Sequence, residues 1–412
     1  MNYNTLMNKP TINYRELIGD NTVSEVGGIT EEEFNTLMNT DLASYYTKAQ
    51  IDDLFSRSYV YREKSGSIVT FDCPASVNGI DKVVSDIVAV QSGNGDPSPT
   101  NVRPFIGWSA VNRYRTGKNF YNPSFTRESG YYDDNGVLQA SNTAGHTQLT
   151  PINYNTYYYY SIHARSIGGK FAVYFWDSNG NWISRVSKDY SSNFDYNNMT
   201  FTTPSNCRYI SFQVPIGTGV TSLEFDDSLT MICLNSLGTD FEPYNGTTYT
   251  TALKDGQGNP LVCYGGTLSN ENGVQTLTDD FVFYTFTGNE SGSTYSGGGF
   301  YLTTGIPVSI TRLDGMCDIA TMISTADNLA NNQGVVANGS AGVGAVAFKF
   351  ENVTTFAEFK TLIAGHTVRL KRSTPQQIPQ DNLAIATQEG VNNIWADSGD
   401  ITVKALDKII QE

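Results

Sequence analysis

The sequence predicts a mainly β protein in which β-sandwich or jelly-roll domains follow a short helical segment near the N-terminus. Short runs of alternating apolar residues fill the chain beyond residue 60, and turn signals separate them, as in sandwiches and jelly rolls. Asn-Gly dipeptides are the strongest short-range hairpin signal, because both residues tolerate the positive φ of a type I′ turn. Seven occur, and they begin at Asn78, Asn94, Asn135, Asn179, Asn245, Asn272 and Asn338.

Residues 30–58 carry the helical pattern. Thr30 with Glu33, and Thr47 with Gln50, have the spacing of a capping box, which marks the start of a helix. Each predicted helix has only about ten residues, and helices this short are marginal in water without a packing partner. We expect a neck in which several copies of the chain bundle, and a helical pair within one chain is the alternative. The residues expected to face the shared axis are Phe34, Leu37, Ile51 and Leu54.

The strand pattern has a period of two, which is typical of half-buried strands. Its clearest runs are Ile210, Phe212 and Val214 between Tyr209, Ser211 and Gln213; Leu229, Met231 and Cys233; and Val368 and Leu370. A helix is predicted over 354–364, where Phe356, Phe359 and Leu362 keep helical spacing. Two predicted hairpins resemble each other, YYDDNGVLQ (131–139) and FWDSNGNWIS (175–184).

The charge balance excludes several classes of function. The 412 residues include 26 Lys+Arg and 41 Asp+Glu, a formal net charge of −15. Nucleic-acid binding needs clustered positive charge, so no nucleic-acid partner is expected. No stretch of about 18 apolar residues exists, so we expect no membrane insertion. The opening MNYNTLMNKP lacks both a cationic and an apolar signal region, so we expect a protein made in a cytoplasm without a signal peptide.

Motifs for metal binding and catalysis are missing from the sequence, so we expect no enzyme, no metal and no cofactor. The cysteines form no C-x-x-C pair, and we expect reduced, mostly buried thiols. No G-x-S-x-G, H-E-x-x-H or phosphate-binding loop is present. The cysteines are Cys73, Cys207, Cys233, Cys263 and Cys317, and the three scattered histidines are His146, His163 and His366.

Four adjacent acidic pairs bear on glycoside hydrolysis, which needs two carboxylates about 5–10 Å apart. Neighbours on a strand point to opposite faces, and three of the pairs adjoin turn signals. Turn and helix-surface roles are therefore favoured over a catalytic role. The pairs are Asp52-Asp53, Asp133-Asp134, Asp226-Asp227 and Asp279-Asp280.

The aromatic residues around residue 177 are the candidate binding site. Sugar rings present apolar C–H faces that pack on Tyr and Trp while polar neighbours hold the hydroxyls. The candidates are Tyr174, Trp176, Trp182 and Arg185, and the alternative is that these rings belong to a sandwich core. A two-residue turn at Asn179-Gly180 would place Asp177 opposite Trp182. The two Trp side chains would then point to opposite faces, with one in the core and one in solvent.

Several segments resemble phage tail proteins. The opening YNTLMNKPTIN (3–13) and SYYTKAQIDDLF (44–55) resemble the N-terminal segments of tail-fibre and receptor-binding proteins, which dock on the tail and trimerise through a short neck. The segment 65–121, with its core QSGNGDPSPTNVRPFIGW, is similar to a module of minor structural tail proteins from phages of Gram-positive hosts. Its continuation is found in FEPYNGTTYTTAL (241–253), YGGTL (264–268) and NNIWADSGDITV (392–403).

The resemblance implies a domain organisation in which residues 121–245 interrupt the tail-protein module. We expect a tail-docking segment (1–29), the trimerisation neck (30–58), the first part of a β-rich domain (59–120), an inserted jelly roll resembling carbohydrate-binding modules (121–245), and the rest of the β-rich domain (246–412).

The expected function is that of a structural virion protein, a homotrimeric tail-fibre or baseplate protein. It would contact other tail proteins through its N-terminus and bind a host surface polysaccharide. Two alternatives stay open. One is a tail-associated depolymerase that uses convergent carboxylates such as Asp226 or Asp279, and the other is a structural spacer without a ligand.

Overall fold

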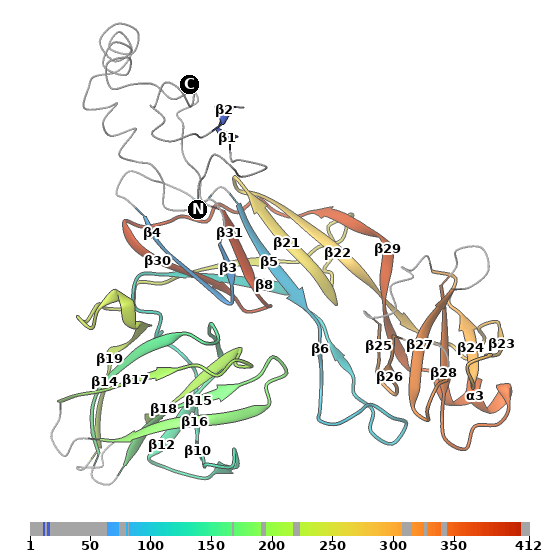
Figure 1. The fold of residues 1–412 in the computed structure, drawn as a ribbon, viewed down its shortest axis with the longest axis horizontal. Helices are drawn as coiled ribbons and strands as arrows, with labels where there is room; N and C mark the ends of the chain where they lie inside the picture. The colour runs from blue at the N-terminus through green and yellow to red at the C-terminus, as the bar shows by residue number, and fades with distance from the viewer. Residues whose placement is uncertain are drawn as a thin grey trace, which may run out of the picture. The chain divides into compact units, whose positions relative to one another are not determined.

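A computed structural model of the chain shows a mainly β protein with several antiparallel sheets, as the sequence predicts (Figure 1). It describes residues 11–12, 15–16, 64–73, 80, 82–166, 169–190, 195–216, 223–306, 315–324, 328–338 and 344–404. The predicted neck, with Phe34, Leu37, Ile51 and Leu54, lies outside these residues. Near the N-terminus, β1 (Thr11–Ile12) pairs with β2 (Arg15–Glu16) in a compact unit of its own.

Two sheets built from distant parts of the chain form what we call the central sandwich. One consists, in order, of β20 (Thr247–Ala252), β8 (Ala110–Thr116), β30 (Gly390–Ala396) and β4 (Ile68–Cys73). The other consists, in order, of β25 (Met316–Cys317), β29 (Thr367–Pro379), β22 (Val274–Thr285), β21 (Gly265–Glu271), β5 (Lys82–Val88), β31 (Ile401–Lys404) and β3 (Lys64–Gly66). Alternate side chains of both sheets, such as Phe71, Val111, Leu268 and Val403, meet in one buried core.

The strands between residues 127 and 234 form a second sandwich, which we call the aromatic sandwich. Its larger sheet consists, in order, of β16 (Trp182–Asp189), β15 (Lys170–Trp176), β18 (Tyr209–Pro215), β12 (Ala144–Thr147) and β9 (Arg127–Ser129). Strand β13 (Thr150–Pro151) also pairs with β18. Its smaller sheet consists, in order, of β17 (Asp195–Thr202), β14 (Tyr157–Ser166) and β19 (Leu223–Leu234). A short 3₁₀ helix (Asn235–Leu237) follows β19.

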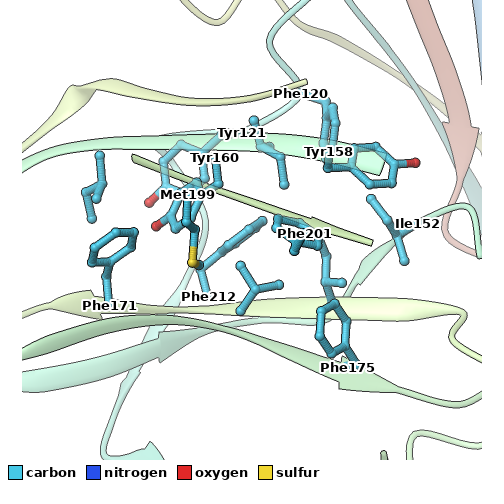
Figure 2. Packing of buried hydrophobic residues seen from close by; sticks show 14 of the residues in the cluster. Phe120, Tyr121, Ile152, Tyr158, Tyr160, Phe171, Phe175, Met199, Phe201 and Phe212 are labelled. Carbon is cyan, nitrogen blue, oxygen red and sulfur yellow. The ribbon is translucent and has the colours of Figure 1, made fainter. Parts of the chain in front are cut away.

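Rings fill the core of the aromatic sandwich (Figure 2). Tyr158 and Tyr160 of β14 point into this core, whereas Tyr157 is 50% exposed, so the tyrosine run divides between the two faces of its strand. Phe120 packs edge-on against Tyr158. Ile68 of the central sandwich also belongs to this core, and the side-chain amide of Asn153 exchanges two hydrogen bonds with the Ile68 backbone. The two sandwiches therefore pack against each other.

A third group of strands, which we call the third lobe, lies between β22 and β29 in the chain. Its sheet consists, in order, of β23 (Gly292–Thr294), β24 (Phe300–Thr303), β28 (Gly344–Lys349), β27 (Gln333–Asn338) and β26 (Thr321–Met322). Helix α3 (Phe356–Ile363) confirms the helix predicted at 354–364 and begins with a capping box of Thr355 and Glu358. Val368 and Leu370 are fully buried in the core of this lobe, which confirms their predicted alternation.

The five cysteines are free and buried, as expected. No helix among the described residues is long and apolar enough to cross a membrane.

Candidate functional site

The two similar hairpins form the same kind of loop, but it differs from the predicted type I′ turn. In each loop an aspartate, Asp133 or Asp177, accepts backbone N–H bonds at its Oδ1 from residues two and four positions later. The glycine, Gly136 or Gly180, has φ near +75° and donates its N–H to the carbonyl oxygen of that aspartate. This is the three-residue hairpin loop with glycine in the left-handed region. The loop at Asp255 has the same bonds and was not predicted.

The loop type changes the register that the sequence predicted for the two tryptophans. Asp177 donates its N–H to the carbonyl oxygen of Asn181, so the pair beyond it is Trp176 with Trp182. The prediction that Asp177 lies opposite Trp182, with the two Trp rings on opposite faces, is therefore wrong. The Asp177 carboxylate favours a loop one residue longer, and this brings both rings to the same face, with centroids 5.5 Å apart.

The predicted site residues do meet, but in a closed cluster. Tyr174 is fully buried and Trp176 is 7% exposed, whereas Trp182 is partly buried. Their face of the sheet is the one opposite the main core, and a hairpin of β10 (Tyr131–Tyr132) and β11 (Leu138–Gln139) covers it. Tyr132 of this hairpin lies 4.8 Å from the Trp176 ring centre and 6.0 Å from that of Trp182.

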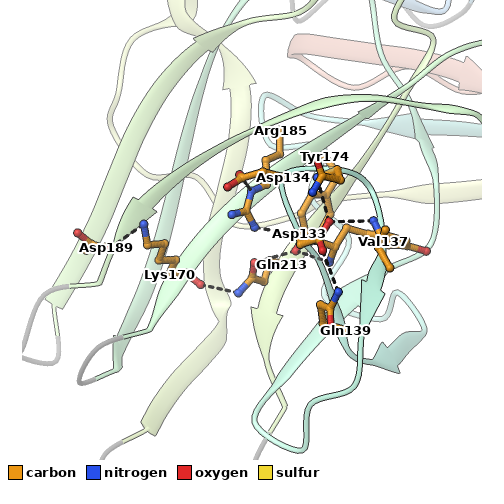
Figure 3. Close-up of polar contacts among 11 residues, drawn as sticks. Asp133, Asp134, Val137, Gln139, Lys170, Tyr174, Arg185, Asp189 and Gln213 are labelled. Carbon is orange, nitrogen blue, oxygen red and sulfur yellow. Dashed lines mark hydrogen bonds and ion pairs between the residues drawn. The ribbon is translucent and has the colours of Figure 1, made fainter.

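Polar contacts fasten this hairpin to the sheet (Figure 3). Arg185 pairs with Asp134 at 2.7 Å and donates a second bond to the Tyr132 carbonyl oxygen at 2.8 Å. The Tyr174 hydroxyl accepts the N–H of Tyr132 and donates to Gln213 Oε1 at 2.7 Å. Trp176 in turn donates its ring N–H to Ser211. Tyr174 and Trp176, which are buried and have their polar groups bonded, therefore form a small second core and offer no open platform for a sugar, and Trp182 lies partly buried at its edge.

An open cleft lies beside this cluster, where the aromatic sandwich meets the central sandwich. It has a volume of about 180 Å³, below the range of about 300–1,000 Å³ typical of pockets for drug-sized ligands. From the central sandwich it is lined by Ser67, Asp86 and Asp400. From the aromatic sandwich it is lined by Pro151, Ser178, Arg208 and Tyr209. A cleft of this size suits one sugar residue better than a long stretch of chain.

The cleft combines ring faces with charged groups. The Arg208 guanidinium lies over the ring of Tyr154, 4.3 Å from its centre, and Tyr154 is 47% exposed. Asp400 accepts a hydrogen bond from the buried Ser67 hydroxyl at 2.8 Å. Burial, and secondarily the charge of Asp400, raises the pKa of the Asp86 carboxyl above its ordinary value. Burial likewise raises the pKa of Tyr209, with Asp400 as a further cause.

Sequence reasoning missed these cleft residues. Asp86, Arg208 and Asp400 lie more than 100 residues apart in the chain, so no local motif joins them. The only signal was the alternation of β18, which placed Tyr209 on the face opposite the core residues Ile210 and Phe212. The structure bears out that separation, since Tyr209 packs with the closed cluster.

The acidic residues suggested for a depolymerase lie elsewhere. Asp226 caps a turn through bonds to the backbone N–H and hydroxyl of Ser228. Asp279 is buried and paired with Arg372 at 3.0 Å. Neither residue lines the cleft. Across the described ranges, no group of three or more His, Cys, Asp or Glu side chains is placed to hold a metal ion.

No protein family and no curated protein matches this chain. Among solved structures, it has a weak similarity to the structure of infectious bursal disease virus Gt strain, with 7% identity and a TM-score of 0.14 over 84% of this chain and 82% of that one. Similarity at this level carries no argument about fold or function.

Proposed function

We propose that the protein is a structural virion component of a phage tail, a tail-fibre or baseplate receptor-binding protein that binds a host cell-surface glycan for adsorption. The observation that carries the glycan-binding part is the open cleft. It places Tyr209 beside the charged groups of Asp86, Arg208 and Asp400, and the exposed ring of Tyr154 lies against the Arg208 guanidinium. Flat apolar faces next to convergent polar groups are what a sugar ring needs from a binding site.

The role in the tail is supported by the sequence resemblance of residues 3–13, 44–55 and 65–121. On this proposal the N-terminus contacts other tail proteins, and the neck joins three copies. A shallow cleft binds one sugar residue weakly. Three clefts per trimer, and several trimers per virion, raise the effective concentration and hence the avidity.

Binding of the purified full-length protein to cell walls of Gram-positive bacteria tests the proposal. Tyr154→Ala and Arg208→Gln should each lower the affinity for a cell wall that the wild type binds by about tenfold or more. The matched control for Tyr154, which contacts the cleft residue Arg208, is Tyr157→Ala, because it removes a ring of similar exposure that does not line the cleft. Melting temperatures should stay close to that of the wild type. Wild-type binding in both Tyr154→Ala and Arg208→Gln would contradict the proposal.

A second candidate is a glycan hydrolase, because Asp86 and Asp400 provide two carboxylates in one cleft. The same incubation distinguishes it, since hydrolysis produces new reducing ends and binding alone does not. Loss of those ends in Asp86→Asn would then assign the activity to the cleft.

A further inference from the structure

We infer that the cleft selects a sugar carrying a free ammonium group, which binds at the carboxylates of Asp86 and Asp400. This inference rests on the proposed glycan-binding function and names the class of sugar.

The two carboxylates come from adjacent strands of the central sandwich. Asp86 lies in β5 and Asp400 directly precedes β31, and the backbone N–H of Asp86 donates to the Asp400 carbonyl oxygen at 2.9 Å. Both residues are exposed and both line the cleft. Asp400 keeps one bond, from Ser67. Within the described part of the chain, the Asp86 carboxylate has neither a hydrogen-bond donor nor an ion-pair partner.

The charges that line the cleft do not neutralise one another. Arg208 is the cation in the lining, and its guanidinium lies on the Tyr154 ring and donates to the backbone carbonyl oxygen of Cys207. It forms no ion pair with either aspartate, as far as the described residues show. Two carboxylates therefore line the cleft together with one arginine, whose guanidinium contacts the Tyr154 ring and the Cys207 carbonyl oxygen. Partial burial, and secondarily the charge of Asp400, raises the pKa of Asp86, and a cation bound beside the two carboxylates would offset the second cause.

The surroundings favour an ammonium group on a sugar over a metal ion. A calcium site usually takes six to eight oxygen ligands, several of them carboxylates, and the described residues hold no group of three or more acidic, His or Cys side chains. A primary ammonium needs only a few acceptors, because it has three donors. The Tyr209 ring and the apolar side of Pro151 then face the carbon skeleton that carries the ammonium group.

Calorimetric titration of the full-length protein at about pH 6 provides the test, with two probes of equal length. These are oligosaccharides of glucosamine, whose amines are protonated, and of N-acetylglucosamine, whose amides are neutral. We expect the wild type to bind the glucosamine probe about tenfold more tightly. Asp86→Asn and Asp400→Asn should remove this preference. The matched control is Asp189→Asn, because that aspartate is exposed on β16 and does not line the cleft.

Each other result overturns the inference in a recognisable way. Equal binding of both probes by the wild type leaves glycan binding intact but removes the ammonium selectivity. An equal loss in Asp189→Asn shows attraction to the acidic protein as a whole. If millimolar calcium raises the melting temperature of the wild type but not of Asp86→Asn, the cleft is a metal site. If neither probe binds while Arg208→Gln still abolishes cell-wall binding, the inference fails and the proposed function stands.

Discussion

Arg113 is fully buried in the central sandwich, and its guanidinium group bonds to three uncharged partners. It donates to Ser85 Oγ at 2.8 Å, to Gln275 Oε1 at 2.8 Å and to the Leu268 carbonyl oxygen at 2.6 Å. Burial lowers the pKa of this arginine to about 10. Because the three partners belong to β5, β22 and β21, the side chain joins the four-stranded sheet to the seven-stranded one.

Replacing Arg113 by alanine should lower the free energy of unfolding by about 3 kcal/mol or more, because it removes three buried hydrogen bonds made by a charged donor, each worth about 1 kcal/mol or more. Urea denaturation would measure the loss. Arg113→Lys should also destabilise, since an ammonium group lacks the planar fork that reaches three acceptors. The control is Lys82→Ala, which breaks a solvent-exposed pair with Glu271 and should therefore change the stability little. Similar losses in Arg113→Ala and Lys82→Ala would contradict this assignment.

Single residues were the hardest feature to predict from the sequence. Arg113 and Arg115 alternate with Tyr114 on a strand, a pattern that suggests a polar, solvent-facing row. The fold places Arg113 between two sheets, where its partners lie 28 to 162 residues away. The cleft residues were missed for the same reason, because only tertiary structure brings Asp86, Arg208 and Asp400 together.

Whole strands and helices were predicted better, because their signals are local. The period-two runs at β18, β19 and β29 are strands, and the helix at 354–364 is confirmed. The turns were predicted less well. Of the Asn-Gly pairs, Asn272-Gly273 forms the expected two-residue turn, with φ of 50° and 85° between the paired residues Glu271 and Val274. At Asn135 and Asn179 the preceding aspartate selects the longer loop instead.

The loop that covers the aromatic cluster should be sensitive to a single methyl group. A Cβ at Gly136 would come within 2.3 Å of the Trp182 ring, whereas at Gly180, in the same kind of loop, the nearest side-chain atom is 3.8 Å away. Both glycines have φ near +75°, so alanine strains the backbone equally at either site. Gly136→Ala should therefore destabilise by about 1–3 kcal/mol more than Gly180→Ala. Equal melting temperatures would show that the hairpin does not press on Trp182.

For the whole molecule, the sequence predicted the sandwich class but not the third lobe. Strands β22 and β29 run on from one core to the next. Leu277 of β22 is buried in the central sandwich, and Phe286, just after the same strand, is buried in the third lobe. The alternation of apolar residues continues through a bulge between Asp279 and Phe281. The sequence pattern therefore does not change at the point where β22 leaves the central sandwich and enters the third lobe.

The predicted trimer concerns residues outside those that the structure describes, and it stays a prediction. Replacing Ile51 and Leu54 by Asp would bury unpaired carboxylates in an apolar seam, at a cost of several kcal/mol. Light scattering should then give a monomer mass where the native protein gives three times that mass. A monomeric native protein would contradict the neck.

The folded molecule should lose stability in alkali. Burial raises the pKa of Cys207 and Cys233 to about 11, and it raises the pKa of Tyr121 and Tyr160 far above the ordinary value of 10. The folded state therefore keeps protons that the unfolded state releases above about pH 9 for thiols and about pH 10 for phenols. The stabilisation is complete below these values and is lost as pH rises. Arg113, with its lowered pKa, acts in the opposite direction but is a single group.

Urea denaturation between about pH 7 and pH 11 checks this prediction. The free energy of unfolding should be nearly constant to about pH 9 and should fall by several kcal/mol by about pH 11. A constant value across the whole range would mean that the buried phenols and thiols titrate as they do in the unfolded chain.

The Asn-Gly loops also bear on how the protein ages chemically. Asparagine before glycine deamidates when the glycine backbone nitrogen attacks the side-chain amide carbon and expels ammonia, and water then opens the resulting succinimide to aspartate or isoaspartate. In the two similar loops, the N–H groups of Gly136 and Gly180 are each bonded to a carbonyl oxygen at 3.1 Å, and the N–H of Gly273 is bonded to Asn270 Oδ1 at 3.2 Å. These bonds hold the attacking nitrogen in place. Asn135, Asn179 and Asn272 should therefore deamidate more slowly during long storage than their Asn-Gly sequences suggest.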